Sequence, residues 1–132
     1  ELKKIEQFCL RNILSSQKIL LLQEKTKRIY LAPKIEKYIM NIVETTRNPL
    51  QYGISKHDAI KVGSSPRGAI GIYIASKANA LLDGRNYVTP HDVKTVAPDV
   101  LRHRIILTYE GIAENVSPDI LIKEILDKTK IP

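Results

Sequence analysis

Four prolines divide this chain into helical segments. Pro33, Pro66, Pro90 and Pro118 each precede a run in which apolar residues recur every three or four positions. Proline suits the first position of a helix because its φ angle is already near the helical value and its missing N–H would have no partner there. Serine or threonine precedes three of these prolines, where a side-chain oxygen can cap the helix. The sequence therefore predicts an all-α fold, a small helical bundle of five to six helices.

The spacing of apolar residues predicts which side of each helix faces the core. In a first helix, from Ser15 or Ser16 to about Arg28, the inward residues are Ile19, Leu20, Leu22 and Ile29. In a second, from Pro33 to about Arg47, they are Ile35, Tyr38, Ile39, Ile42, Val43 and Thr46. In a third, from Pro66 to about Asp83, they are Ile70, Tyr73, Ile74, Ala78, Leu81 and Leu82. In a fourth, from Pro90, they are Val93, Val96, Ala97, Val100 and Leu101, and in the last, from Pro118, they are Leu121, Ile122, Ile125 and Leu126.

Four parts of the sequence depart from this helical pattern. Pro98 predicts a break of the fourth helix into two short ones. Residues 28–31 favour β structure, but four residues support at most one very short β pairing. Residues 105–116 fit either a helical or an extended conformation, and residues 48–63 form a long connection of a kind that is often functional.

Length and composition place the chain in one soluble domain. It has 132 residues, of which 43% are hydrophobic and 27% charged, and no apolar run reaches the length of a membrane span. The start of the sequence is charged and lacks a signal-peptide pattern, so we expect a cytoplasmic protein with no membrane partner. The single cysteine, Cys9, cannot form an internal disulfide, and we expect it to be a small buried hydrophobe in a reducing compartment.

The charge of the chain permits an anionic partner without identifying one. Lysine and arginine number 21 against 14 acidic residues, a net charge of +7, but the only dense basic run is Lys25, Lys27 and Arg28. Tryptophan is absent and phenylalanine occurs once, which argues against an aromatic platform on which the bases of a single-stranded nucleic acid could stack. We therefore expect no specific nucleic-acid partner, although a stand-alone helical nucleic-acid-binding or adaptor module remains the alternative.

The motifs of a complete enzyme are absent from the sequence. No glycine-rich phosphate-binding loop occurs. The histidines at positions 57, 91 and 103 lack metal-ligand spacing with one another and with Cys9, so no metal site is expected. Ser64 and Ser65 have no histidine and aspartate arranged to activate them. These absences favour a binding or regulatory domain.

The segment Gly63–Gly68 carries the most specific chemistry. Ser65 falls at the N-cap and Pro66 at the first helical position, so Arg67 lies in the first turn. A helix N-terminus already favours an anion, and a guanidinium adds a planar fork that matches phosphate oxygens. The alternative is an ordinary exposed arginine behind a Ser-Pro cap. Gly68 and Gly71 cost helix stability, which suggests that a backbone or a ligand comes close.

Three segments in this order resemble the C-terminal lid of the MoxR family of AAA+ ATPases. They are Gly63 to Gly68, Gly84-Arg-Asn-Tyr-Val-Thr-Pro-His-Asp-Val93, and Val100-Leu-Arg-His-Arg104. The resemblance covers the chain from about residue 12. It implies a helical lid of the AAA+ type over residues 13–132 and a connecting segment over residues 1–12, after a core domain that this sequence does not contain.

The resemblance also implies a function. In that family the arginine of the Ser-Pro-Arg motif is sensor 2, which contacts ATP bound with Mg²⁺ in the core domain. This role falls on Arg67, with Ser65, Pro66 and Gly68 as the residues that hold it in place. The whole protein would then be a ring-forming ATPase that remodels or assembles a client, with its own core, neighbouring subunits and a von Willebrand A-domain protein as partners.

The resemblance leaves other positions without a ligand role. Arg85, His103 and Arg104 match motif positions, and we expect them to be structural or to lie at interfaces. The family usually has alanine where this chain has Ser64 and Gly68, a small change that should leave the arginine in place. A lid without its core should expose an apolar surface where the core docks.

Overall fold

The computed structural model describes residues 12–132. The helices are α1 (Ser16–Arg28), α2 (Pro33–Arg47), α3 (Pro66–Leu82), α4 (Pro90–Leu101), α5 (Tyr109–Ala113) and α6 (Pro118–Lys128), with a short 3₁₀ turn at His57–Ala59. Strands β1 (Ile60–Val62) and β2 (Ile106–Leu107) pair antiparallel. The prediction of a small all-α bundle with one short β pairing is confirmed. Cys9 and most of the expected connecting segment lie outside the described residues.

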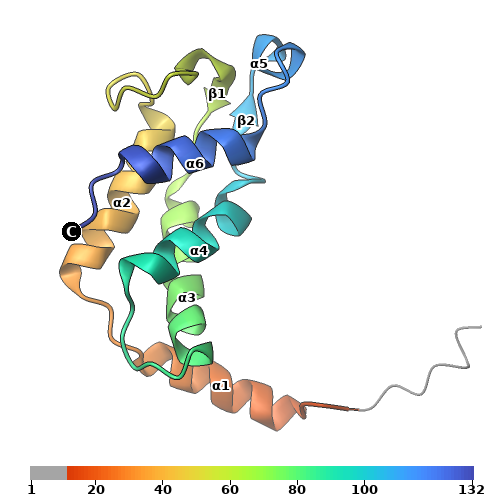
Figure 1. Ribbon diagram of the computed structural model, residues 1–132. Helices are drawn as coiled ribbons and strands as arrows, with labels where there is room; N and C mark the ends of the chain where they lie inside the picture. The colour runs from red at the N-terminus through yellow and green to blue at the C-terminus, as the bar shows by residue number, and fades with distance from the viewer. Residues whose placement is uncertain (1–11) are drawn as a thin grey trace, which may run out of the picture.

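Four helices make the body of the domain. Figure 1 shows α6 crossing α2 and α4, with α3 beside α4 and the β1–β2 pair near the N-terminal end of α3. Helix α1 lies across the other end of α3, apart from the rest of the bundle (Figure 1). A backbone contact also joins the segment after α1 to the segment after α3, where Tyr30 forms an isolated parallel bridge with Tyr87. No helix among residues 12–132 is both long and apolar enough to span a membrane.

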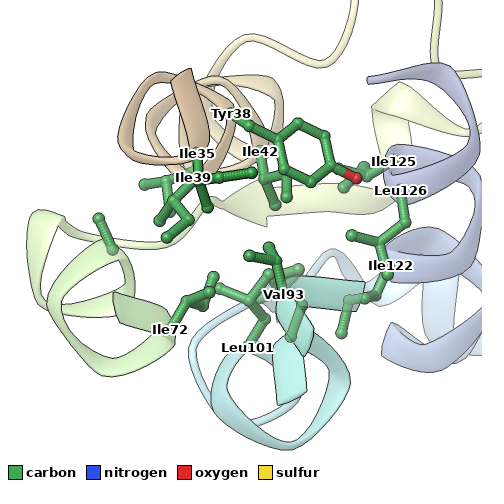
Figure 2. Packing of buried hydrophobic residues seen from close by; sticks show 14 of the residues in the cluster. Ile35, Tyr38, Ile39, Ile42, Ile72, Val93, Leu101, Ile122, Ile125 and Leu126 are labelled. Carbon is green, nitrogen blue, oxygen red and sulfur yellow. The ribbon is translucent and has the colours of Figure 1, made fainter. Parts of the chain in front are cut away.

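The core lies between α2, α3, α4 and α6, as the close view in Figure 2 shows. The inward faces predicted for α2 and α6 are confirmed, since all their members are buried. In α4, Val93, Ala97 and Leu101 are fully buried, and Val96 and Val100 are partly buried. The tyrosine ring of Tyr38 fills the space between α2 and α6 (Figure 2).

The predicted core face of α1 is wrong, and that of α3 is wrong in part, since Tyr73 and Leu81 are partly buried and pack against the core. Helix α1 buries none of its residues, and only Ile29, just beyond it, is buried. In α3, Ile70, Ile74 and Leu82 are exposed, whereas the buried residues are Gly68, Ala69, Ile72, Ser76, Lys77 and Ala80. Two glycines let α4 approach α3 closely, because a Cβ at Gly68 or Gly71 would press on Leu101 or Val100 of α4.

The prediction of a break at Pro98 is also wrong. Helix α4 continues through Pro98 to Leu101. An internal proline costs about 3 kcal/mol, but an unbroken helix keeps Val93, Ala97 and Leu101 on one buried face. Burying a valine or leucine side chain is worth about 1.5–3 kcal/mol, so Val93 and Leu101 together can offset the proline. Residues 105–116 contain both of the conformations that the sequence left open, strand β2 and then helix α5.

Candidate functional site

The turn before α3 is fixed against the C-terminal end of α2. The backbone N–H of Ser64 donates to Thr46 Oγ1 at 2.9 Å, and that hydroxyl donates to the Val43 carbonyl at 2.6 Å. Ser64 and Thr46 are fully buried. A side chain at Gly63 would collide with the Thr46 backbone. The glycine therefore allows two backbone segments to touch, and the start of α3 cannot shift relative to α2.

Helix α3 begins where the sequence predicts, but its N-cap lacks the expected side-chain hydrogen bond. Ser65 is the N-cap and Pro66 the first residue of α3, as predicted. The Ser65 side chain makes no capping hydrogen bond. Instead the Gly68 N–H donates to the Ser65 carbonyl at 2.8 Å. Since Pro66 has no N–H and Gly68 has already found an acceptor, few donors remain for the exposed hydroxyl.

Arg67 lies in the first turn of α3 and is exposed. Its guanidinium forms no hydrogen bond or ion pair with any of residues 12–132. The first turn also contains no acidic residue. A guanidinium at the positive end of a helix dipole, with no carboxylate in its own helical turn, is electrostatically suited to an anion with several oxygens.

Arg67 begins an exposed apolar stripe on α3. Ile70 and Ile74 follow it at spacings of three and four, so the three residues share one face of the helix. Ile70 is 58% exposed and Ile74 56% exposed. Beside the stripe, a hollow of about 270 Å³ lies between α2 and α3, lined by Glu36, Ile39, Met40, Ala69, Ile70 and Tyr73.

The apolar surface extends to α1. A second hollow, of about 480 Å³, separates α1 from α3 and is lined by Gln23, Thr26, Lys27, Tyr73, Ile74, Lys77 and Ala78. The outer residues Ile19, Leu20, Leu21 and Leu22 of α1 are exposed as well. The expectation of an exposed apolar surface is thus confirmed, and Arg67 lies at one end of it.

Gly68 belongs to the opposite face of α3. It is buried, and a Cβ there would collide with Ser64 Oγ and lie 3.3 Å from Leu101 Cδ2. At Gly71 a Cβ would lie 2.8 Å from Val100 Cγ1. Packing against α4 and the preceding turn therefore accounts for both glycines, without a ligand.

Arg85 and Asp92 form a second polar cluster at the C-terminal end of α3. The two terminal nitrogens of Arg85 donate to the two carboxylate oxygens of Asp92 at 2.7 and 2.6 Å. Arg85 also pairs with Asp83 at 2.8 Å. Asp92 is fully buried and further accepts from Asn79 Nδ2 and the Thr89 N–H. The predicted capping box of Thr89 and Asp92 is present.

This cluster is structural. Burial alone raises the pKa of Asp92, but the hydrogen bonds from Arg85, Thr89 and Asn79 outweigh it and hold that pKa well below its usual range. Hydrogen bonds to Asp92 and Asp83 raise the pKa of Arg85 further. With its guanidinium engaged in this way, Arg85 fixes the turn between α3 and α4, as expected for a residue without a ligand role.

The remaining candidate positions are spread over the surface. Arg104 Nε donates to the Val100 carbonyl at 3.0 Å, which is also a structural role. His91 and His103 are exposed, and His57 pairs with its neighbour Asp58. In the described part of the chain no three histidine, cysteine or acidic side chains gather as metal ligands would.

Lys77 is the polar residue that sequence analysis missed. Its side chain is buried, and Nζ donates to the Lys27 carbonyl at 2.7 Å and lies 5.2 Å from the centre of the Tyr73 ring. It thereby ties the last turn of α1 to α3. A lysine flanked by Ser76 and Ala78 on a small-residue face could have been recognised as buried, but its partner is a backbone atom that carries no sequence pattern.

Comparison with known proteins agrees with this geometry. The model of the AAA lid domain family matches residues 54–125. The chain is 39% identical over 123 residues to the chaperone MoxR1 of Mycobacterium tuberculosis, covering 92% of this chain and 33% of that protein. It is 34% identical over 99 residues to the protein MoxR of Paracoccus denitrificans, covering 70% of this chain and 29% of that protein.

A solved structure extends the likeness to three dimensions. The crystal structure of a putative ATPase from Cytophaga hutchinsonii superposes with a TM-score of 0.88 at 38% identity, covering 92% of this chain and 37% of that one. This chain thus spans about a third of the length of the proteins it matches. It belongs to the AAA lid domain family, as the C-terminal lid of a MoxR-family AAA+ ATPase.

Proposed function

We propose that this lid supplies Arg67 as sensor 2 to ATP bound by the core domain of the full-length protein. The observation that supports the proposal is the setting of Arg67, exposed in the first turn of α3 and unpaired within residues 12–132. Ser65 and Pro66 start the helix there, and Ser64 and Gly68 fix it to α2 and α4. A phosphate group fits this setting, since it matches both the guanidinium fork and the helix dipole.

Arg67 would act by stabilising negative charge on the phosphate oxygens. ATP with Mg²⁺, held by the core, supplies the reacting phosphoryl group, and a guanidinium beside it stabilises the negative charge on its oxygens. Because the contact needs the terminal phosphate, it weakens once that phosphate leaves, and the orientation of the lid then follows the nucleotide state.

The exposed apolar surface of α1 and α3 would dock on the core. Its position beside Arg67 supports this assignment, because docking there would bring the guanidinium and the apolar stripe to the same interface. Lid rotation in a ring of subunits would then do work on a client, which is the chaperone-like remodelling or metal-insertion and assembly role proposed for the parent. A von Willebrand A-domain protein is the proposed partner for that work.

The test is Arg67→Ala in the full-length parent, with ATP turnover and nucleotide affinity as readouts. An arginine that meets transition-state charge can be worth on the order of a thousandfold or more, and we expect a smaller loss because sensor 2 also contributes to ground-state binding. Arg67→Lys should restore only part of the activity, since an ammonium lacks the bidentate fork.

Two controls accompany this test. Lys61→Ala removes an exposed cation from β1 and should leave turnover unchanged. The 132-residue chain alone should hydrolyse no ATP, because it has no phosphate-binding loop. Unchanged turnover for Arg67→Ala in a protein that still binds ATP and assembles would show that Arg67 is an ordinary surface arginine.

A further inference from the structure

Two exposed tyrosines lie side by side at the end of the domain where α1 meets α3. Tyr30 N donates to the Asn86 carbonyl at 2.9 Å, and Val88 N donates to the Tyr30 carbonyl at 2.9 Å. Tyr30 and Tyr87 are therefore direct partners in a parallel bridge, which places their side chains on the same side of it. Tyr30 is 62% exposed and Tyr87 50% exposed. Both hydrogen bonds of the bridge join backbone atoms, so the bridge itself does not depend on the rings.

A groove with a basic rim adjoins this pair. It has a volume of about 640 Å³ and is lined by Lys25, Arg28, Ile29, Leu81, Gly84, Arg85, Asn86 and Tyr87. No carboxylate is among these residues. Arg85 is already engaged by Asp83 and Asp92. Lys25 and Arg28, by contrast, form no ion pair within residues 12–132, and they are the cations left for a ligand.

This surface is separate from the Arg67 site. Helix α3 has 17 residues, so its two ends are about 24 Å apart. Arg67 is at the N-terminal end, whereas Leu81 and the residues of the following turn are at the C-terminal end (Figure 1). The function proposed for Arg67 therefore gives no account of the tyrosine pair or of its unpaired cations.

We propose that Tyr30, Tyr87, Lys25 and Arg28 bind an acidic segment of a partner protein that also carries apolar residues. Tyrosine and arginine are the residues most enriched where binding energy concentrates in protein interfaces. The unpaired cations give charge complementarity to carboxylates. A nucleic acid fits less well, because the groove offers only two unpaired cations and is also lined by the apolar Ile29 and Leu81, whereas nucleic-acid affinity depends on many phosphate contacts.

The test measures peptide binding to the 132-residue chain at physiological salt by fluorescence anisotropy. The probe is a fluorescein-labelled peptide of glutamates around a central Leu-Phe pair, and its matched control has glutamine at every glutamate. We expect Tyr87→Ala, and separately the pair Lys25→Gln with Arg28→Gln, to weaken binding of the glutamate peptide about tenfold or more.

Matched variants distinguish binding at this site from nonspecific electrostatic or hydrophobic binding. Tyr109→Ala removes a tyrosine that is 84% exposed on α5, and the pair Lys18→Gln with Lys123→Gln removes two exposed lysines elsewhere. Both should leave affinity unchanged. The inference is overturned if these variants weaken binding as much, if the glutamine peptide binds as tightly, or if oligothymidylate displaces the peptide and binds more tightly. Lys25 and Arg28 lie outside the core, so their variants stay informative should Tyr87→Ala fold poorly.

Discussion

The Ser64 side chain fills the space that a side chain at Gly68 would need. Substituting alanine at both positions tests whether Gly68 is a packing residue or a ligand residue. A Cβ at position 68 would collide with Ser64 Oγ, while its next neighbours, Ser64 Cβ and Leu101 Cδ2, would be 3.3 Å away. The hydroxyl must therefore turn to another rotamer and give up its hydrogen bond to the Ser65 carbonyl, at 3.2 Å. Alanine at both positions would remove this conflict.

The expected magnitudes follow from these contacts. Crowding a packed site costs roughly 1–3 kcal/mol, whereas replacing glycine by alanine inside a helix gains about 1 kcal/mol. Gly68→Ala alone should thus destabilise the domain by about 1 kcal/mol. With Ser64→Ala already present, the collision is gone, and the same change should be neutral or stabilising by up to about 1 kcal/mol. The two sites should therefore be coupled by about 2 kcal/mol.

The assay is urea unfolding of the 132-residue chain, followed by far-UV circular dichroism for the wild type, both single variants and the double variant. Ala78→Gly, at a half-exposed position of α3, measures the glycine cost in this helix without the collision. If the effects of Ser64→Ala and Gly68→Ala add to within about 0.5 kcal/mol, the packing argument is wrong. The double variant should also keep normal ATP turnover in the full-length parent, which a ligand role for Gly68 would forbid.

Two further predictions concern the polar contacts around α3. Asp92→Asn should cost about 1–3 kcal/mol at neutral pH, because the donors of Arg85, Thr89 and Asn79 lose a charged acceptor in a buried position, while Arg85 keeps its ion pair with Asp83. Because the pKa of Asp92 is lowered on folding, this contribution is present above the unfolded value near pH 4 and is lost as the pH falls through the lower folded value. Urea unfolding at several pH values should therefore show that the difference in unfolding free energy between wild type and variant shrinks below about pH 4. A difference that stays constant with pH would contradict this reasoning. Lys77→Met should speed hydrogen exchange of the last α1 amides about tenfold by removing the contact with the Lys27 carbonyl, while α4 amides stay unchanged; equal acceleration in both helices would mean a global effect.

The accuracy of the sequence analysis varied from helix to helix for physical reasons. Helices α2 and α6 have one apolar face and one polar face, and they pack on the core of this domain, so their buried residues were predicted correctly. The cap of α4 was also predicted, because Thr89 and Asp92 satisfy each other locally. The prediction at Pro98 was wrong because the local cost of a proline in a helix does not include the buried face that continues on both sides of it.

The candidate site was predictable where its determinants are local. The position of Arg67 follows from Ser65 and Pro66 alone. The meaning of Gly68 and Gly71 does not, because it depends on Ser64, Leu101 and Val100, which only the fold brings near. The same limit hid the Tyr30–Tyr87 pair, whose members are far apart in sequence and meet through backbone hydrogen bonds.

The errors on α1 and α3 support the docking proposal. Both helices have isoleucine and leucine at helical spacing, and in this domain those residues are exposed. Burying one such side chain is worth about 1.5–3 kcal/mol, so an exposed row that begins at Arg67 is costly to keep unless something covers it. A hydrophobic pattern records burial in the whole molecule, and this chain spans about a third of its relatives. The exposed stripe therefore supports the proposal that α1 and α3 dock on a core domain with Arg67 at the interface.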